Sequence, residues 1–295
     1  MESTNPSQLR SISLPSRSNP SFSQIEINLN KLKTLEPFYS STRIHTGLAC
    51  LTDLYTSVNE LLGSTQTQKV NLQSRNKVLI EDALVRSTRL MDSYGSLLEL
   101  LGQMKGSARV LQFALRRKGV ATYSTTDGHL MDYFLSRKKA KKNIVACVRS
   151  LEQMEREIES CLVDGEDHHL SMVIRVLREI VTATISLFRY VLVILSGKPK
   201  LDHKLYTFIT RLMQTGKPSC HKSQEIINDA DMIDLTLDSL WKDIKTNECK
   251  TVDVQMVMER LHKLDREIEG HEVGLDCLFR KLLQTRVSLL NILAN

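Results

Sequence analysis

The feature that most constrains this chain is a long apolar stretch, Asp167–Leu195, with the sequence DHHLSMVIRVLREIVTATISLFRYVLVIL. Its polar residues recur at helical steps of three and four, which places them on one narrow stripe: Arg175, Arg178, Glu179, Thr182, Ser186 and Arg189. Almost every other position is Val, Ile, Leu, Met or Phe, so other parts of the chain must cover most faces of this helix. At 1.5 Å per residue the helix is roughly 43 Å long, which is enough for several partner helices to pack along it.

The same stretch has a second interpretation, as a membrane span. A span needs roughly 20 residues with few or no charges. Here the uncharged run Ile180–Phe188 is followed directly by Arg189, and a charge at the bilayer centre costs about 2.5 kcal/mol or more on insertion scales. We therefore favour the buried central helix of a bundle over a transmembrane helix.

The composition of the whole chain favours an all-α fold. The chain has 295 residues, with 12 glycines, 6 prolines and 5% aromatic residues. Few turn-forming and aromatic residues together with abundant leucine are typical of long helices rather than of strands. We find no alternating strand pattern. The sequence therefore predicts one elongated bundle of roughly seven or eight helices as a single domain over residues 25–295.

Helical patterns follow one another along this domain with short interruptions. They cover approximately Ile25–Leu35, Thr42–Leu62, Ser74–Lys118, Asp127–Leu162, Asp167–Leu195, Asp202–Gln214, Ser223–Lys245 and Val252 to the C-terminus. Gly95, Gly102 and Gly106 are positions where the third helix could bend or split, because a glycine costs about 1 kcal/mol in a helix interior.

The last helix has the most regular heptad pattern of the chain. Its apolar seam consists of Val254, Val257, Leu261, Leu264, Ile268, Leu275, Leu278, Leu282, Leu289 and Ile292. Only His271 and Thr285 interrupt it. A sustained repeat of 3.5 residues favours coiled-coil-like packing, at a crossing angle near about 20°, against a neighbouring helix. The pattern leaves open whether that neighbour belongs to this chain or to another.

Residues 1–24 form a segment of different composition, rich in serine and proline, in which Glu2 is the only acid. Such a segment cannot bury enough apolar surface to fold, so we predict a disordered tail; a transit peptide has a similar composition. Within it, Arg10, Ser13 and Pro15 fit the R-S-x-S-x-P pattern that 14-3-3-type modules bind once the second serine is phosphorylated. The phosphate then pairs with an arginine cluster of the module.

A run of basic residues lies within one of the predicted helices. Its five positive charges are Arg137, Lys138, Lys139, Lys141 and Lys142. The run is either a solvated helix face or a contact for an anionic partner, such as the nuclear-import machinery or an anionic membrane surface, where each charge contributes about 1 kcal/mol. Because no aromatic residues are interleaved with the charges, nucleic-acid binding is disfavoured.

The acidic residues of another predicted helix also suggest a solvated face. They are Asp229, Asp231, Asp234 and Asp238. Because no apolar side chains surround them to separate their pKa values, we interpret them as solvated carboxylates rather than as a paired acid and base. The six cysteines are scattered without a CxxC pair, which indicates buried thiols in a reducing compartment.

No motif in the chain identifies a reaction. The GKP tripeptides at Gly197 and Gly216 lack the upstream strand and the glycine spacing of a phosphate-binding loop. His168–His169 and Cys220–His221 are adjacent pairs, and neighbours on a helix point about 100° apart instead of sharing the face that a zinc site needs. We therefore predict a protein that is not an enzyme and that holds no cofactor and no metal, with a peripheral membrane protein that uses its basic helix face, or an uncharacterised enzyme, as the alternatives.

Several segments resemble one plant family. They are RSISLPSRSNP, LMDSYG, LQFALRRK, YFLSRKKAKK and the terminal LFRKLLQTRVSLLNIL. Together they resemble the plant-specific family of unknown function that includes the BYPASS-related proteins, over nearly the whole chain; Asn19 stands where the family's first motif has histidine. The resemblance implies an all-helical protein of root and shoot development without a known catalytic activity. We expect it in the cytoplasm, with the nucleus, the plastid or the membrane periphery as alternatives, and bound to protein partners.

The tail motif gives a first prediction. A synthetic peptide of residues 6–20 with phosphorylated Ser13 binds a 14-3-3-type module, and the unphosphorylated peptide does not, because the phosphate supplies about −1.5 to −2 charge for the arginine cluster. Fluorescence anisotropy measures both affinities. Equal binding of the two peptides, or no binding of either, contradicts the prediction.

Overall fold

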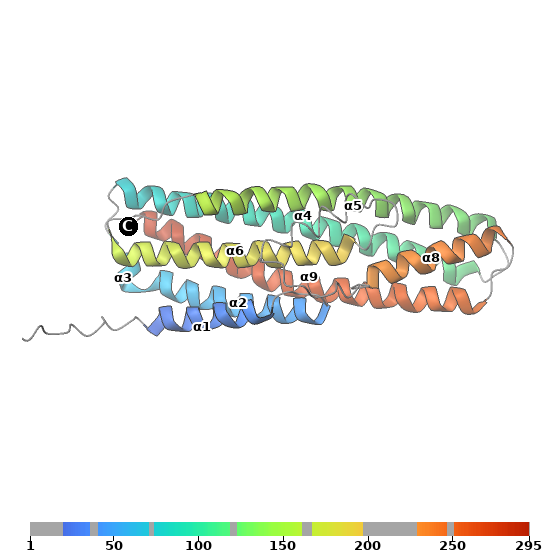
Figure 1. The fold of residues 1–295 in the computed structure, drawn as a ribbon, viewed down its shortest axis with the longest axis horizontal. Coiled ribbons are helices and arrows are strands. Elements are labelled where there is room, and N and C mark those ends of the chain that lie inside the picture. The colour runs from blue at the N-terminus through green and yellow to red at the C-terminus, as the bar shows by residue number, and fades with distance from the viewer. Residues whose placement is uncertain are drawn as a thin grey trace, which may run out of the picture.

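The structure, a computed structural model, describes residues 20–35, 41–70, 74–118, 123–160, 167–196, 229–246 and 251–294. These residues form helices and no strand: α1 (Pro20–Leu35), α2 (Ser41–Gly63), α3 (Thr65–Gln68), α4 (Ser74–Lys118), α5 (Tyr123–Ser160), α6 (His168–Ser196), α8 (Asp229–Lys245) and α9 (Thr251–Ala294). Figure 1 shows an elongated bundle in which the long helices lie side by side. The predicted all-α fold class is confirmed.

The central position of α6 follows from its apolar circumference. The helix packs against α2, α4 and α5, with α1 and α8 at its margins, and Ile185 and Leu187 are fully buried. By length and composition α6 is the one described helix that could cross a membrane, but these neighbours cover its apolar faces. The buried central helix is confirmed.

The polar stripe of α6 faces the seams between the neighbouring helices. Arg189 Nη1 donates a hydrogen bond to Glu155 Oε2 of α5 at 2.7 Å. On another side, Glu179 lies 3.5 Å from Lys33 Nζ of α1. The charged side chains that interrupt the apolar pattern therefore tie α6 to two of the helices that cover it.

The heptad seam of α9 packs against helices of the same chain, α2 and α4. Both residues that interrupt the seam are buried within it. Thr285 Oγ1 donates to Asn59 Oδ1 of α2 at 2.7 Å, and Asn59 Nδ2 donates to the Lys281 carbonyl at 3.3 Å. Asn59 thus accepts one hydrogen bond from α9 and donates another to it, which satisfies the buried hydroxyl and amide groups and fixes the register of α9 on α2.

Glycine acts differently in α4 and in α9. The three glycines of α4 neither split nor end the helix, which continues from Ser74 to Lys118 because α5 and α9 pack along it. In α9, by contrast, a Cβ added at Gly274 would lie 2.8 Å from Leu48 Cδ1 of α2. At this position the glycine permits a close approach of the two helices.

Two boundaries differ from the sequence prediction or lie outside the described residues. α1 begins at Pro20, so residues 20–24, which were predicted to belong to the tail, are helical. Proline suits the first turn of a helix because its missing N–H needs no partner there, and the burial of Ile25 and Leu29 anchors the segment. The predicted helix Asp202–Gln214 and the motif residues Arg10, Ser13 and Pro15 lie outside the described residues.

Candidate functional site

The basic run and the acidic helix meet in the bundle. Arg137 of α5 is only 3% exposed. Its Nε and Nη2 donate to Asp234 Oδ1 and Oδ2 of α8 at 3.0 and 2.9 Å, a bidentate ion pair. Lys141, one turn further along α5, donates from Nζ to the same Oδ2 at 3.1 Å. One carboxylate of α8 therefore binds two cations of α5.

The same arginine also binds the end of the central helix. Arg137 Nη1 donates to the Leu195 carbonyl at 2.9 Å, and Nη2 donates to the Ser196 carbonyl at 3.4 Å. The last carbonyls of a helix have no partner within it, and a cation there also compensates the helix dipole. We call Arg137, Lys141, Asp234 and these two carbonyls the Arg137 clasp, because together they join α5, α6 and α8.

Electrostatics keep the Arg137 clasp charged. Burial by itself would raise the pKa of the Asp234 carboxyl. The charges and hydrogen bonds of Arg137 and Lys141 outweigh burial and hold that pKa below its usual range. An anion with two cations leaves one net positive charge, and the carbonyl oxygens of α6 partly compensate it. The arrangement connects helices and presents no nucleophile or proton donor to a substrate.

These positions correct two predictions. Arg137 was predicted on a basic surface and lies inside, because its position continues the buried series Leu130, Tyr133, Ala140 and Ile144 on one face of α5. Asp234 was interpreted as solvated, and it is ion-paired to that arginine. The basic run therefore splits, with Arg137 and Lys141 turned inward.

The other three residues of the run, Lys138, Lys139 and Lys142, are exposed. Of the remaining acidic residues, Asp238 is half-buried, and the side chains of Asp229 and Asp231 lie outside the described part of the chain.

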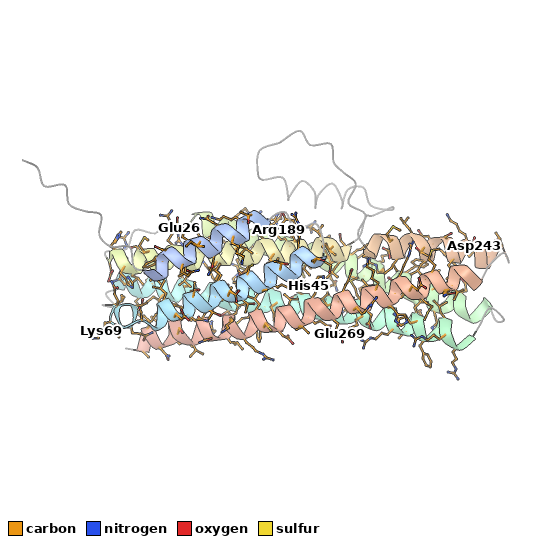
Figure 2. All side chains as sticks on the ribbon, turned by 90° about the horizontal axis from the view of Figure 1, so that it is seen from below. Glu26, His45, Lys69, Arg189, Asp243 and Glu269 are labelled. Carbon is orange, nitrogen blue, oxygen red and sulfur yellow. The ribbon has the colours of Figure 1, made fainter. Side chains whose placement is uncertain are left out.

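A pair of histidines forms a second polar cluster, between α2 and α9. The rings of His45 and His271 lie edge to face with their centroids 4.6 Å apart, and Figure 2 labels His45 where α2 runs along α9. His45 lies so close to α9 that a Cβ added at Gly270 would be 2.7 Å from its Cε1. On the other side, the Ser41 hydroxyl lies 3.3 Å from His271 Nε2.

Both histidines of this pair have lowered pKa values. Burial lowers the pKa of His271 to about 4, and the neighbouring charge of His45 acts in the same direction. Burial also lowers the pKa of His45, against the effect of a hydrogen bond to the Glu267 backbone. Both rings are therefore neutral at pH 7. In the sequence, His271 stands out only as an interruption of the heptad seam, because its partner lies too far away in the chain for any local pattern to reveal the pair.

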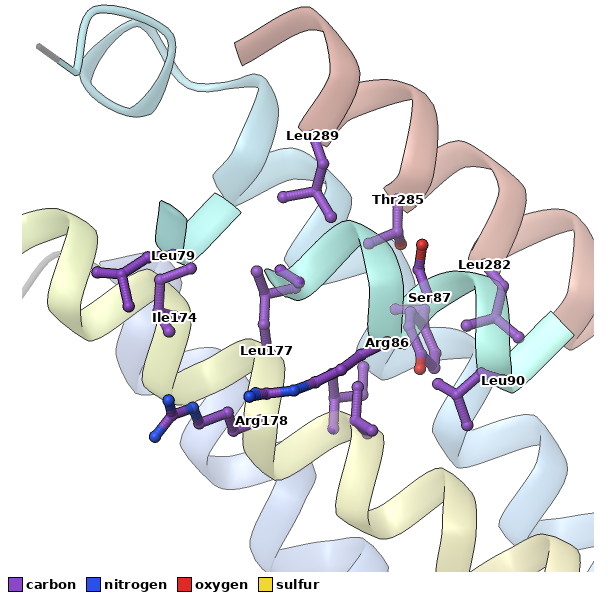
Figure 3. Close-up of a pocket in the computed structure, with 14 residues that line it drawn as sticks. Leu79, Arg86, Ser87, Leu90, Ile174, Leu177, Arg178, Leu282, Thr285 and Leu289 are labelled. Atoms are coloured by element: carbon purple, nitrogen blue, oxygen red, sulfur yellow. The ribbon is translucent and has the colours of Figure 1, made fainter. Parts of the chain in front are cut away.

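A small hollow lies among α2, α4, α6 and α9. Figure 3 shows Leu177 of α6 and Leu289 of α9 beside it, with Arg86 reaching from α4 toward α6. Arg86 is buried and forms an ion pair with Asp82 of its own helix. The cavity volume is about 20 Å³, which accommodates about one water molecule. The hollow is therefore a packing gap rather than a substrate site.

Comparison with known proteins identifies a family. The family model described as Protein BPS1 matches residues 47–292, which run from within α2 to the last turn of α9. No curated protein and no solved structure matches the chain. The matched range confirms the resemblance to the plant family that includes the BYPASS-related proteins.

The Arg137 clasp predicts a strong dependence of stability on one buried arginine. Arg137→Met leaves Asp234 with one cation and removes the donors to the Leu195 and Ser196 carbonyls. The free energy of unfolding in urea falls by about 3 kcal/mol, because Asp234 loses its bidentate donor and the two carbonyls lose theirs, and each buried acceptor left unsatisfied costs about 1–3 kcal/mol. The matched control is Lys138→Met, one position along the same helix, which changes it by less than about 0.5 kcal/mol. Equal losses in the two variants contradict the assignment.

The histidine pair predicts a loss of stability at acidic pH. Because the pKa of His271 in the folded protein lies below its unfolded value, its contribution is complete above about pH 6.5. That contribution is lost as the pH falls toward 4, at up to about 1.4 kcal/mol per pH unit. Urea denaturation between pH 7 and 5 measures this slope. His271→Leu makes the slope shallower, whereas the exposed His168→Leu leaves it unchanged; an unchanged slope in His271→Leu refutes the prediction.

Proposed function

The chain belongs to the Protein BPS1 family, and we propose that it is a non-enzymatic regulatory protein that binds protein partners through the outer surface of its bundle. Membership of this family points to a regulatory role in plant development. The finer proposal is that the protein acts in root and shoot development by recruiting partners from the cytoplasm. Its role in development rests on the family resemblance, and its binding of partners rests on the exposed surface.

The observation that carries the proposal is an exposed apolar stripe on α9. Leu283, Val287 and Leu290 follow one another at steps of four and three, so their side chains share one helix face. All three are exposed, Val287 to 54%. The heptad seam on the other side of the same helix is buried against α2 and α4. An exposed apolar stripe at this spacing fits the apolar face or groove of a partner protein.

The polar interior supports a non-enzymatic role. The buried charges of the Arg137 clasp join helices, and the histidine pair lies between α2 and α9. Asn59 and Thr285 bind each other across the bundle. Each of these groups has a partner or a position that contributes to packing. Of these groups only Thr285 lines the hollow among α2, α4, α6 and α9, which has room for about one water molecule. The chemistry that remains for recognition lies on the outside of the molecule.

The N-terminal tail supplies a second proposed contact. Phosphorylation of Ser13, with Arg10 and Pro15 in the motif around it, would create a site for a 14-3-3-type module that is separate in sequence from the α9 stripe. Such a contact would make partner binding dependent on a kinase without a change in the bundle, since a charge in the tail leaves the packed helices unaffected.

The α9 stripe is tested by partner capture and by rescue in the plant. Val287→Asp with Leu290→Asp places two carboxylates on the stripe and leaves the buried seam intact. The matched control, Ile27→Asp with Val78→Asp, changes two side chains of α1 and α4 that are equally exposed. We expect the stripe variant to lose specific partners and to fail to restore root and shoot growth in plants that lack the protein. The control variant should retain both properties, and both should melt at the temperature of the unmodified protein.

Two results contradict the proposal. One is a stripe variant that keeps all partners and rescues growth. The other is a loss of partners in both variants together, which would show that any added surface charge, and not the stripe, is responsible.

A further inference from the structure

Three lysines on the outside of α5 play no part in holding the fold together. Lys138, Lys139 and Lys142 are exposed, and within the described part of the chain they form no ion pair. Their neighbours Arg137 and Lys141 both bind Asp234. The fold therefore neutralises the inward half of the basic run and leaves the outward half without a counter-charge.

Apolar side chains continue the line of these lysines. Met131, Leu135, Lys138 and Lys142 follow at steps of four, three and four, which places them on one stripe of the helix. Met131 and Leu135 are exposed, Leu135 to 57%. We define the α5 outer face as Met131, Leu135, Lys138, Lys139 and Lys142. Two exposed apolar side chains directly beside three uncompensated cations have no role in the stability of a water-exposed helix.

The neighbouring helix α4 carries exposed apolar side chains at the same level of the bundle. α4 and α5 lie side by side and run in opposite directions (Figure 1). Their register is set by the ion pair between Arg89 and Glu157, and continuing it places Val110 and Phe113 level with residues 133–136 of α5. Both are exposed, Phe113 to 64%, and the guanidinium of Arg117 lies 5.9 Å from the Phe113 ring centroid. Apolar and cationic groups of α4 are therefore exposed at the same level of the bundle as the α5 outer face.

This chemistry points to an anionic lipid surface as the partner. Helices that lie at a membrane interface combine apolar side chains, which enter the headgroup region, with lysines or arginines that attract anionic lipids. Lysine suits mobile headgroups because its ammonium is a point charge on a flexible stem and needs no fixed bidentate geometry. A single-stranded nucleic-acid site would instead gather several aromatic residues for base stacking, whereas Phe113 is here paired with Arg117.

We propose that the α5 outer face docks this protein peripherally on membranes that contain anionic lipids. The helix lies along the surface, and Met131 to Lys142 covers roughly 16 Å of it. Docking of this kind goes beyond the proposed binding of protein partners and uses a different part of the molecule. It concentrates the protein at a membrane, while the α9 stripe remains the site for a protein partner. A protein that fails to bind membranes can therefore still be tested for partner binding through the α9 stripe, and the reverse also holds.

Vesicle binding by the purified full chain tests the proposal. The probes are phosphatidylcholine vesicles with about 30% phosphatidylserine and vesicles of phosphatidylcholine alone, compared by co-sedimentation. We expect binding only to the anionic vesicles. Lys138→Gln with Lys139→Gln and Lys142→Gln weakens it on the order of 100-fold, since each cation contributes roughly a factor of five at such a surface. Lys141 and Arg137 stay unchanged, so that Asp234 keeps its partners.

Two further variants separate the face from the overall charge. Lys31→Gln with Lys69→Gln and Lys77→Gln removes the same charge from exposed lysines elsewhere on the bundle, and we expect it to bind as the unmodified protein does. Leu135→Gln weakens binding about 10-fold, because the leucine side chain leaves water when it enters the headgroup region and glutamine gains much less from that transfer. Melting curves confirm that all variants are folded.

Several outcomes overturn the proposal. They are an unmodified protein that does not bind anionic vesicles, equal binding to neutral vesicles, and equal weakening by the two triple variants. Binding of a short duplex DNA that the α5 triple variant abolishes, without any vesicle binding, overturns it in favour of nucleic acid. In each case the α9 stripe experiment still decides the proposed function separately.

Discussion

The burial of α6 is the constraint on which the rest of this structure depends. A helix that is apolar around most of its circumference is stable in water only if other helices cover it, and α2, α4 and α5 do so. Polar contacts between helices accompany this burial. Tyr55 and Thr184 place their hydroxyls 3.0 Å apart within the core, and Arg189 pairs with Glu155. α9 then packs on the outside of this group, against α2 and α4.

The end of α6 creates a second requirement, which the Arg137 clasp meets. In Figure 1 the bundle continues beyond α6, where α8 follows it along α5 and α9. The last carbonyls of α6 therefore face protein and need donors there. A buried arginine supplies them and requires a carboxylate in turn, which α8 provides. This pairing also determines what the surface of α5 presents. Arg137 and Lys141 face inward to Asp234, so Lys138, Lys139 and Lys142 remain exposed beside apolar side chains.

Much of this fold could be predicted from periodicity, and the polar contacts could not. The apolar pattern of α6 and the heptad of α9 predict which faces are buried, since each pattern is local in sequence. Arg137 lies on the buried face of α5 by that same periodicity, yet a run of five charges suggests a solvated face. The ion pair with Asp234 decides between a buried and a solvated Arg137. Asp234 lies 97 residues further along the chain, so no local sequence pattern reveals the pair. The same limit hid the contact between His45 and His271.

Native-state hydrogen exchange tests the central claim most directly, because the slowest amides of a protein exchange only when the whole domain unfolds. If the other helices are organised around α6, the amides of Ile180 to Leu192 exchange with the free energy of global unfolding measured in urea. Those of α1, which covers one margin, exchange faster. Exchange in α6 as fast as in α1, at a free energy well below the global value, would contradict the account.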